Sequence, residues 1–211
     1  MPSFRDAFSK CPLVAILRGV EPLAAVEIGR VLIDAGFCIL EVPMNSPQPL
    51  NSIALLSKAF AGKALVGAGT VTAPDQVLKV GEVGGRLIVM PHADASVVRA
   101  TKAGGLYALP GFATPTEAFA MIAAGADALK LFPAEANPPK VLKAMRAVLP
   151  KEMPILPVGS ITPDNMGEYW AAGASGFGLG SALYKPGAQP AQVAENARAF
   201  MSALGKLRTS A

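Results

Sequence analysis

The sequence predicts an α/β fold, specifically a (β/α)8 barrel of the TIM type, from a repeated glycine pattern, eight short apolar runs and the absence of a polar edge strand. Six segments begin where a glycine closes a helical pattern and then continue into an apolar run: 35–43, 61–69, 83–91, 103–111, 124–133 and 172–180. Glycine tolerates the left-handed conformation that commonly follows a helix. A short apolar run ended by Pro or Gly is typical of a strand buried on both faces.

Two further apolar runs, 12–18 and 153–159, bring the expected strands to eight. Strands that alternate with helices predict parallel βα units, and eight such units close a barrel. The alternative is an open, doubly wound sheet, but that sheet would need an edge strand less apolar than the rest, and none of the eight runs fits. We expect one β/α-barrel domain over 1–211, with a short helix before the first strand.

Several of the expected helices have a start signal, in which a proline or a capping side chain precedes the helical pattern. These signals are at Glu21-Pro22, Ala73-Pro74-Asp75, Asp94, Thr114-Pro115-Thr116-Glu117 and Thr162-Pro163-Asp164. The pair Thr114 and Glu117 also has the spacing of a capping box.

Composition narrows the function classes. Of the 211 residues, 52% are hydrophobic and only 16% are charged, against about 25% charged in an average protein, so we expect a homo-oligomer that hides part of its surface. The net charge of +4 comes from scattered residues, which argues against a nucleic-acid partner.

No apolar run reaches the roughly 18 residues of a membrane span. The beginning of the chain lacks a signal-peptide layout, so we expect a cytoplasmic protein.

Three expected strands carry a charged residue near the carboxyl end, where barrel enzymes build their active sites. These residues are Arg18, Glu41 and Lys130. Glu41 follows Gly36 by five positions, and Lys130 follows Gly125 by five positions. Equivalent positions on the second and sixth strands should lie at one height and point inward from opposite walls. The sequence therefore predicts that a carboxylate and an amine converge, and the alternative is a buried ion pair without chemistry.

An amine in a partly apolar interior has a lowered pKa and becomes nucleophilic. Lys130 could then attack a keto group to form an imine, which acts as an electron sink for the neighbouring C–C bond. Glu41 could move the protons. This is Schiff-base lyase chemistry, for which we expect no cofactor and no metal.

The remaining polar groups fit a substrate with an anion at each end. Arg18 and Thr70 would bind a carboxylate. Small residues expose backbone amides to a phosphate in the loops after the last two strands, here Gly159, Ser160, Gly180 and Ser181. Phe132 lies two residues beyond Lys130 and therefore on the same face, so we expect it to contact the pyruvate part of the substrate. His92, the only histidine, receives no role.

The chain resembles the 2-keto-3-deoxy-6-phosphogluconate aldolase family over about residues 12 to 205. The resemblance rests on Leu129-Lys130-Leu131-Phe132-Pro133, Gly67-Ala68-Gly69-Thr70, Pro110-Gly111 with Thr114-Pro115-Thr116-Glu117, and Gly180-Ser181-Ala182-Leu183. It implies a trimeric barrel that releases pyruvate and glyceraldehyde 3-phosphate from a phosphorylated sugar acid. It also implies that Lys130 is the Schiff-base lysine and Glu41 the general acid/base. Arg18, Thr70 and Pro91 would form the pyruvate pocket, and Gly159, Ser160, Gly180 and Ser181 the phosphate site.

Two departures from the gluconate-specific members resemble the 2-keto-3-deoxy-6-phosphogalactonate aldolases. The segment after Glu41 reads Pro43-Met44-Asn45-Ser46-Pro47-Gln48 and lacks an arginine, and Val158 replaces a threonine before the glycine of the seventh strand. The two substrates differ at C4, so Val158 and Asn45 are the expected C4-specificity residues. A hydroxyl exchanged for a methyl there is worth about 1–3 kcal/mol. A further departure, Ser160 in place of the family's second glycine, leaves that phosphate contact open.

We therefore expect a class I aldolase that cleaves 2-dehydro-3-deoxy-6-phosphogalactonate. A gluconate-type or 4-hydroxy-2-oxoglutarate aldolase of the same family is an alternative. Two other classes also stay open: a phosphate-binding barrel isomerase or epimerase with Glu41 as its base, and a catalytically silent barrel that binds a phosphorylated metabolite.

Overall fold

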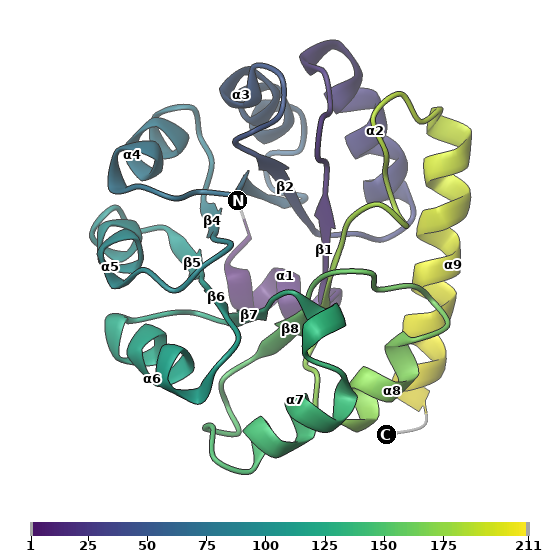
Figure 1. Cartoon of the computed structure of the whole chain (residues 1–211). Coiled ribbons are helices and arrows are strands. Elements are labelled where there is room, and N and C mark those ends of the chain that lie inside the picture. The colour runs from purple at the N-terminus through teal and green to yellow at the C-terminus, as the bar shows by residue number, and fades with distance from the viewer. Residues whose placement is uncertain (1, 210–211) are drawn as a thin grey trace.

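The structure is a computed structural model that describes residues 2–209, and within them short parallel strands alternate with helices (Figure 1). The strands are β1 (Leu13–Ile16), β2 (Ile39–Pro43), β3 (Leu65–Gly69), β4 (Leu87–Val89), β5 (Tyr107–Leu109), β6 (Gly111–Phe112), β7 (Leu129–Leu131), β8 (Ile155–Pro157) and β9 (Phe177–Leu179). The helices are α1 (Phe4–Lys10), α2 (Pro22–Asp34), α3 (Pro49–Ala59), α4 (Pro74–Glu82), α5 (Ala95–Ala103), α6 (Pro115–Ala124), α7 (Pro139–Arg146), α8 (Met166–Ala171) and α9 (Pro190–Thr209), with a 3-10 turn η1 (Ala134–Ala136).

The strands form a curled parallel sheet in two segments. One segment has the order β5-β4-β3-β2-β1-β9 and the other β6-β7-β8. An isolated parallel bridge between Val158 and Gly178 links β8 to β9. The expected α/β class and parallel sheet are confirmed, and α2 to α9 surround the strands in Figure 1.

One expected strand is divided. The run 103–111 gives β5 and the start of β6, because Pro110 between them has no N–H to donate to a neighbouring strand. Each of the eight apolar runs nevertheless contains a strand, and the second part of the divided run continues to Phe112.

The glycine pattern was predicted correctly. The glycine that follows the helix in each of the six segments has a positive φ, between 67° and 107°: Gly36, Gly62, Gly84, Gly105, Gly125 and Gly173. A left-handed residue at this place ends a helix and turns the chain back into the next strand, so the repeat marks where each βα unit begins again.

The helix starts were predicted with one error. Asp94 caps α5 by accepting hydrogen bonds from the N–H groups of Ser96 and Val97, and Thr114 with Glu117 forms the expected capping box of α6. The expectation at Thr162 was wrong. Its N–H donates to Oδ1 of Asn165 (3.0 Å), which closes a turn before the helix, so α8 begins only at Met166.

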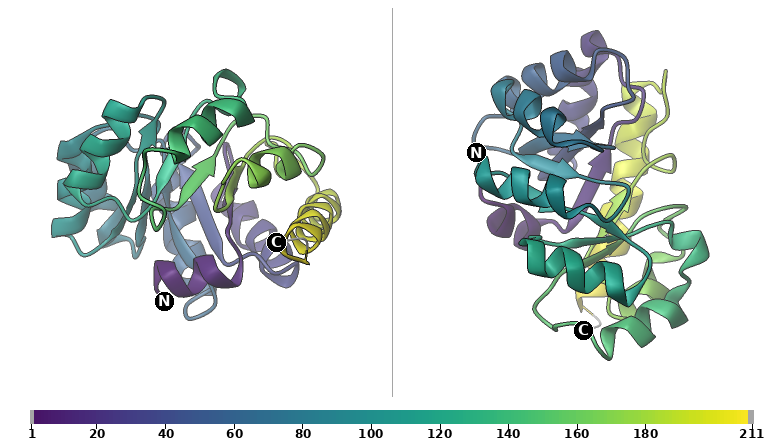
Figure 2. Two further views of the ribbon diagram at one scale, coloured as in Figure 1. Left: turned by 90° about the horizontal axis from the view of Figure 1, so that it is seen from below. Right: turned by 60° about the vertical axis from the view of Figure 1, so that its left-hand side comes forward.

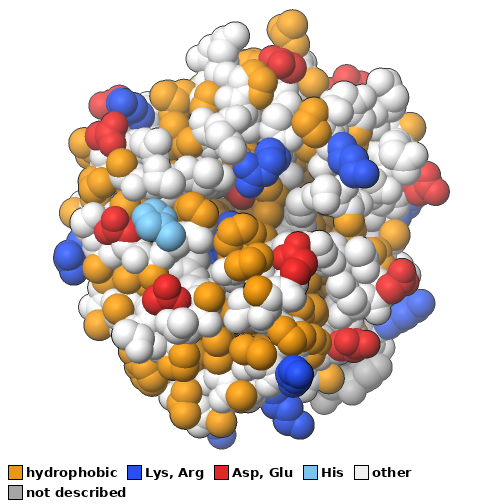
Figure 3. Space-filling model, in the orientation of Figure 1, with side chains coloured by type: hydrophobic (Ala, Val, Ile, Leu, Met, Phe, Trp, Pro, Cys, Tyr) orange, Lys and Arg blue, Asp and Glu red, His pale blue; other side chains and the backbone are white. Residues whose placement is uncertain are grey.

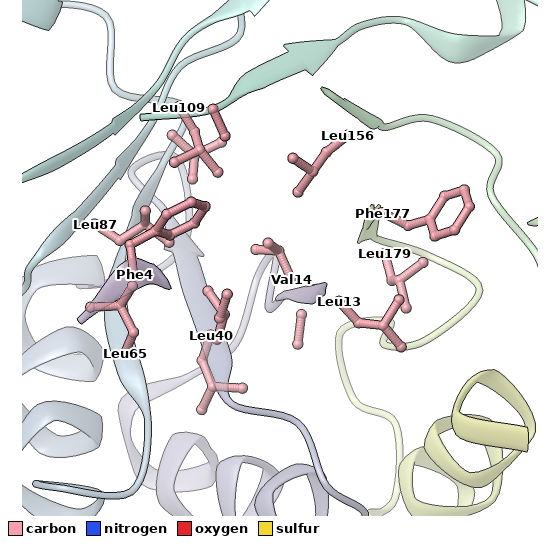
Figure 4. Packing of buried hydrophobic residues seen from close by; sticks show 14 of the residues in the cluster. Phe4, Leu13, Val14, Leu40, Leu65, Leu87, Leu109, Leu156, Phe177 and Leu179 are labelled. Atoms are coloured by element: carbon pink, nitrogen blue, oxygen red, sulfur yellow. The ribbon is translucent and has the colours of Figure 1, made fainter. Parts of the chain in front are cut away.

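Helix α1 confirms the expected helix before the first strand and lies across the ends at which the strands begin (Figure 2). The ring of Phe4 lies 5.9 Å from that of Tyr107 at the start of β5. At the other end of the six-stranded segment, Phe8 packs against Gly176, just before β9. Figure 4 shows Phe4 beside Leu65 and Leu87, among the buried side chains of the strands. The helix therefore covers this end of the strands with apolar groups.

The strand register places one set of side chains on the inner side of the curled sheet. Ile16 pairs with Glu41, Leu109 pairs with Val89, and Lys130 pairs with Leu156. These residues line one small inner chamber together with Val14, Val158 and Gly178. Val14, Leu109 and Leu156 point toward one another in Figure 4. Among residues 2–209, no helix is both long enough and apolar enough to cross a bilayer.

Candidate active site

Glu41 and Lys130 come together in the inner chamber. Glu41 extends from β2 and Lys130 from β7, and both line the chamber with seven other residues. Both side chains are buried, with 2% and 6% of their surface exposed. Each changes the other's pKa by its charge. The predicted convergence of the two groups is therefore observed.

The carboxylate of Glu41 is held against the backbone of β3. A Cβ atom at Gly69 would overlap the carboxyl group of Glu41. Oε2 of Glu41 is buried and has no hydrogen-bond partner among the described residues. Burial raises the pKa of Glu41 from 4.5 to about 7, although the charges of Lys130 and Arg18 act in the opposite direction. A carboxyl group in this state can both give and take a proton near neutral pH.

The amine of Lys130 lies in an environment that favours its neutral form. Burial lowers the pKa of Lys130, and the nearby charge of Arg18 adds to this effect, while Glu41 opposes it. Nζ lies 4.7 Å from the centroid of the Phe132 ring. Only the neutral form of an amine is a nucleophile, so a lowered pKa makes Lys130 more nucleophilic than an exposed lysine. Phe132 thus limits the direction from which a reactant can approach it.

Arg18 lies two residues beyond the end of β1. Side chains that follow the neighbouring strands β2 and β3 accept hydrogen bonds from it. Nη1 of Arg18 donates to Oδ1 of Asn45 (2.8 Å), and Nη2 donates to Oγ1 of Thr70 (3.5 Å). Thr70 directly follows β3 and has a φ of 55°. The structure therefore brings together Arg18 and Thr70, as predicted for a carboxylate site, and adds Asn45, which was expected near C4.

An outer cavity of about 310 Å³ opens where the strands end. Its lining is Ile16, Arg18, Phe132, Glu135, Val158, Gly159, Ser160, Ile161, Gly180, Ser181, Ala182, Tyr184, Lys185 and Pro186. Ile16 and Val158 also line the inner chamber, so the two spaces adjoin. Figure 3 shows this face, on which acidic and basic side chains lie among apolar ones near the centre.

Val158 lies where the inner chamber and the outer cavity adjoin. Its side chain is 7% exposed, and its Cγ2 atom would lie only 2.6 Å from a Cβ at Gly178 on β9. The absence of a side chain at Gly178 thus leaves room for Val158. A methyl group faces this junction where a threonine would present a hydroxyl.

The four expected phosphate residues Gly159, Ser160, Gly180 and Ser181 all line the outer cavity. The hydroxyl of Ser160, however, donates to Oε1 of Glu135 on η1 (2.6 Å). Ser160 is thereby engaged with a carboxylate, which the sequence did not predict.

Comparison with known proteins identifies the family of the chain. The family model for KDPG and KHG aldolases matches residues 5–196. The chain belongs to the KDPG and KHG aldolase family. This aldolase is 45% identical to the 2-dehydro-3-deoxy-6-phosphogalactonate aldolase of Escherichia coli K12, over 92% of this chain and 95% of that one. It is 44% identical to the probable 2-dehydro-3-deoxy-6-phosphogalactonate aldolase of Rhizobium meliloti 1021, over 91% of each chain.

A solved structure of similar sequence has the same fold. The aldolase superposes with a TM-score of 0.93 on the native KDPGal structure, with 44% identity and coverage of 95% of this chain and 97% of that one. The chain is accordingly a lyase of carbohydrate metabolism, and a class I, Schiff-base mechanism is typical of its family.

Three polar residues of the aldolase's outer cavity were missed by the sequence reasoning: Glu135, Tyr184 and Lys185. All three lie outside the strands, in segments without hydrophobic periodicity. Lys185 could have been found from the sequence, because it is a basic residue that lies shortly after the expected phosphate residues Gly180 and Ser181. Two other residues lie apart from the cavity lining. Pro91 packs its backbone against Gly111, and His92 is exposed, with Nε2 3.8 Å from Oδ2 of Asp94.

Proposed function

We propose that this aldolase cleaves 2-dehydro-3-deoxy-6-phosphogalactonate to pyruvate and D-glyceraldehyde 3-phosphate. The observation that carries the proposal is the buried pair of Lys130 and Glu41 in one chamber. The similarity to relatives named for this substrate supports the choice within the family. The outer cavity supports it as well, because it adjoins the chamber and can take the rest of a six-carbon acid.

In the first step, Lys130 is the nucleophile. Its neutral Nζ attacks the C2 ketone to form a carbinolamine, which loses water to give a protonated imine. The imine then withdraws the electron pair of the C3–C4 bond. The lowered pKa of Lys130 supports this role.

Glu41 is the proton carrier in the proposal. Its carboxylate takes the proton of the C4 hydroxyl as the C3–C4 bond breaks, which leaves the aldehyde and an enamine on Lys130. The same group then returns a proton to C3, and hydrolysis of the imine releases pyruvate. The pKa of Glu41 near 7 and its unpartnered Oε2 both support this role.

The two anionic ends of the substrate fit the two ends of the site. Arg18 would bind the carboxylate, with Thr70 beside it. Pro91, which was expected in the same pocket, lines neither the outer cavity nor the inner chamber. The position of Asn45 supports an indirect role, because its side chain holds Arg18 and does not line the outer cavity. The phosphate would lie against Gly180 and Ser181, with Lys185 as its cation, because the carboxylate of Glu135 lies against the expected phosphate residue Gly159.

We also propose that both segments of the sheet form one closed (β/α)8 barrel and that residues 1–211 are a single domain. Lys130 N–H donates to the Pro110 carbonyl (2.9 Å), and Asp127 N–H donates to that of Ala108 (3.0 Å). These bonds connect β5 to the β7 segment, while the bridge from Val158 to Gly178 connects β8 to β9. Counting β5 and β6 as one interrupted strand leaves eight.

The aldolase is proposed to be a cytoplasmic homotrimer, without nucleic-acid or membrane partners. Five large apolar side chains are exposed on the described chain, which supports self-association: Leu23, Leu55, Leu78, Phe119 and Val148. Leu23 is the extreme case, with 99% of its surface exposed. Sedimentation at micromolar concentration tests this, and a monomer would contradict it.

Borohydride trapping tests the proposed chemistry. Pyruvate plus borohydride should add one reduced pyruvate to the peptide that contains Lys130, and the Lys130→Arg variant should show no mass gain. Lys143→Arg, on the exposed face of α7, is the matched control and should be trapped like the wild type. An unmodified Lys130 in active protein would contradict the aldolase mechanism and favour an isomerase with Glu41 as its base.

A further inference from the structure

The carboxylate of Glu135 has a fixed position in the outer cavity. Its Oε1 accepts the hydrogen bond from Oγ of Ser160 (2.6 Å). A Cβ at Gly159 would overlap its Oε2. The carboxylate therefore lies on the glycine and is held by the serine.

The supporting backbone is also anchored. Ala134, which precedes Glu135, donates its N–H to the carbonyl of Val158 (2.9 Å). Ser160 has a φ of 47°, in the left-handed region that side chains other than glycine rarely adopt. Its carbonyl accepts from Nδ2 of Asn165 (2.9 Å). This loop thus presents the Ser160 hydroxyl toward Glu135.

The charge of Glu135 determines what it can contact. A phosphate dianion in direct contact with a carboxylate is disfavoured, whereas a hydroxyl can donate a charge-assisted hydrogen bond to it. Arg18 and Lys185 line the same cavity and can bind the two anionic ends. Glu135 is therefore suited to the uncharged, hydroxyl-bearing stretch of the substrate between them.

The position of Glu135 selects one hydroxyl. Val158 lines both spaces, so in the proposed reaction the C4 hydroxyl beside Glu41 would lie at this junction. Glu135 lines the outer cavity and does not line the inner chamber that contains Lys130, so it would face the substrate beyond C4. We propose that Glu135 is a specificity-determining residue that accepts a hydrogen bond from the C5 hydroxyl of the substrate, with Ser160 as its positioning residue. This inference rests on the proposed function.

The reverse reaction gives a direct test, because C5 of the acid is C2 of the aldehyde. Pyruvate is condensed either with D-glyceraldehyde 3-phosphate or with 3-phosphooxypropanal, which lacks only that hydroxyl. Wild-type kcat/KM should favour the hydroxylated aldehyde by roughly 10- to 100-fold, the range of a charge-assisted hydrogen bond. Glu135→Ala should remove most of this preference by lowering kcat/KM for the hydroxylated aldehyde alone.

Further variants distinguish the roles. Glu135→Gln keeps an acceptor and should retain part of the preference, and Ser160→Gly should weaken it less than Glu135→Ala does. Glu168→Ala, an exposed carboxylate on α8 outside the cavity lining, should behave like the wild type. Equal losses on both aldehydes in Glu135→Ala would indicate a structural role and overturn the proposal. A gain on both would also overturn it, because Glu135 would then only repel the phosphate.

The test separates this inference from the proposed function. Failure of the wild-type protein to condense pyruvate with D-glyceraldehyde 3-phosphate would contradict the proposed function itself. If the wild type condenses them and Glu135→Ala leaves the hydroxyl preference unchanged, the proposed function stands and the role of Glu135 is wrong.

Discussion

Gly69 lies directly against the carboxyl group of Glu41, so closely that a Cβ atom at position 69 would overlap both carboxylate oxygens. The glycine is the last residue of β3, and Glu41 extends from β2 beside it. A residue without a side chain is therefore what permits the acid to lie in the chamber with Lys130.

The Gly69→Ala variant should separate imine formation from proton transfer. Displacement of Glu41 should lower the rate of cleavage roughly 100-fold or more, the usual contribution of a positioned acid or base. Trapping of pyruvate on Lys130 should persist, because Lys130 is on β7. Gly205→Ala, where an added Cβ meets nothing within 4 Å, is the control. Equal loss of trapping and cleavage would show that the variant disturbs more than Glu41.

Glu41 should make stability depend on pH. Its pKa is about 7 in the folded protein and 4.5 in the absence of burial, so between these values the folded state binds the proton that the unfolded chain has released. The free energy of unfolding should thus fall as pH rises through this window, by at most about 3 kcal/mol. Below pH 4.5 both states are protonated and the penalty disappears.

The Glu41→Gln variant lacks this penalty. Denaturant unfolding at pH 5 and pH 8 should show that the variant gains stability relative to the wild type at the higher pH. A difference between the two proteins that does not change with pH would contradict the raised pKa of Glu41.

Val158→Thr should change the preference between substrates that differ at C4. A hydroxyl at the junction of the two spaces offers a hydrogen bond to one epimer, worth about 1–3 kcal/mol. The ratio of kcat/KM for the phosphogluconate and phosphogalactonate acids should move toward the former. Val89→Thr adds the same hydroxyl to the inner chamber from β4 and should leave the ratio unchanged. An unchanged ratio in Val158→Thr would remove the basis for the epimer assignment.

Asn45→Ala tests whether Asn45 acts through Arg18. Loss of the 2.8 Å hydrogen bond should loosen Arg18 and raise KM several-fold, as expected for an interaction of about 1 kcal/mol. Because the carboxylate is common to both C4 epimers, both should be affected equally. Asn51→Ala, an exposed asparagine on α3, is the control. A change confined to one epimer would instead support direct contact at C4.

The sequence predicted the parts of the site that follow from periodicity. Gly36 and Gly125 mark equivalent points of two βα units, and this repeat was sufficient to place Glu41 and Lys130 together. The interruption of β5 and β6 was not predicted, because Pro110 lies within an otherwise continuous apolar run. The same limit applied to Ser160: its contact with Glu135 depends on a left-handed residue and on the 3-10 turn η1, neither of which has a hydrophobic pattern. The start of α8 was misplaced because a side-chain bond of Asn165 competes with the proline signal.

The position of α1 has a kinetic consequence. Phe4 and Phe8 cover the end of the strands opposite the outer cavity. Reactants and products therefore reach or leave Lys130 through the outer cavity, which would hold the phosphorylated half of the substrate. In cleavage, the aldehyde must therefore leave the site before pyruvate does. In the reverse, condensing reaction, the keto acid must bind before the aldehyde. We expect ordered steady-state kinetics in both directions, because α1 closes the other end of the strands, and not because of the chemistry alone.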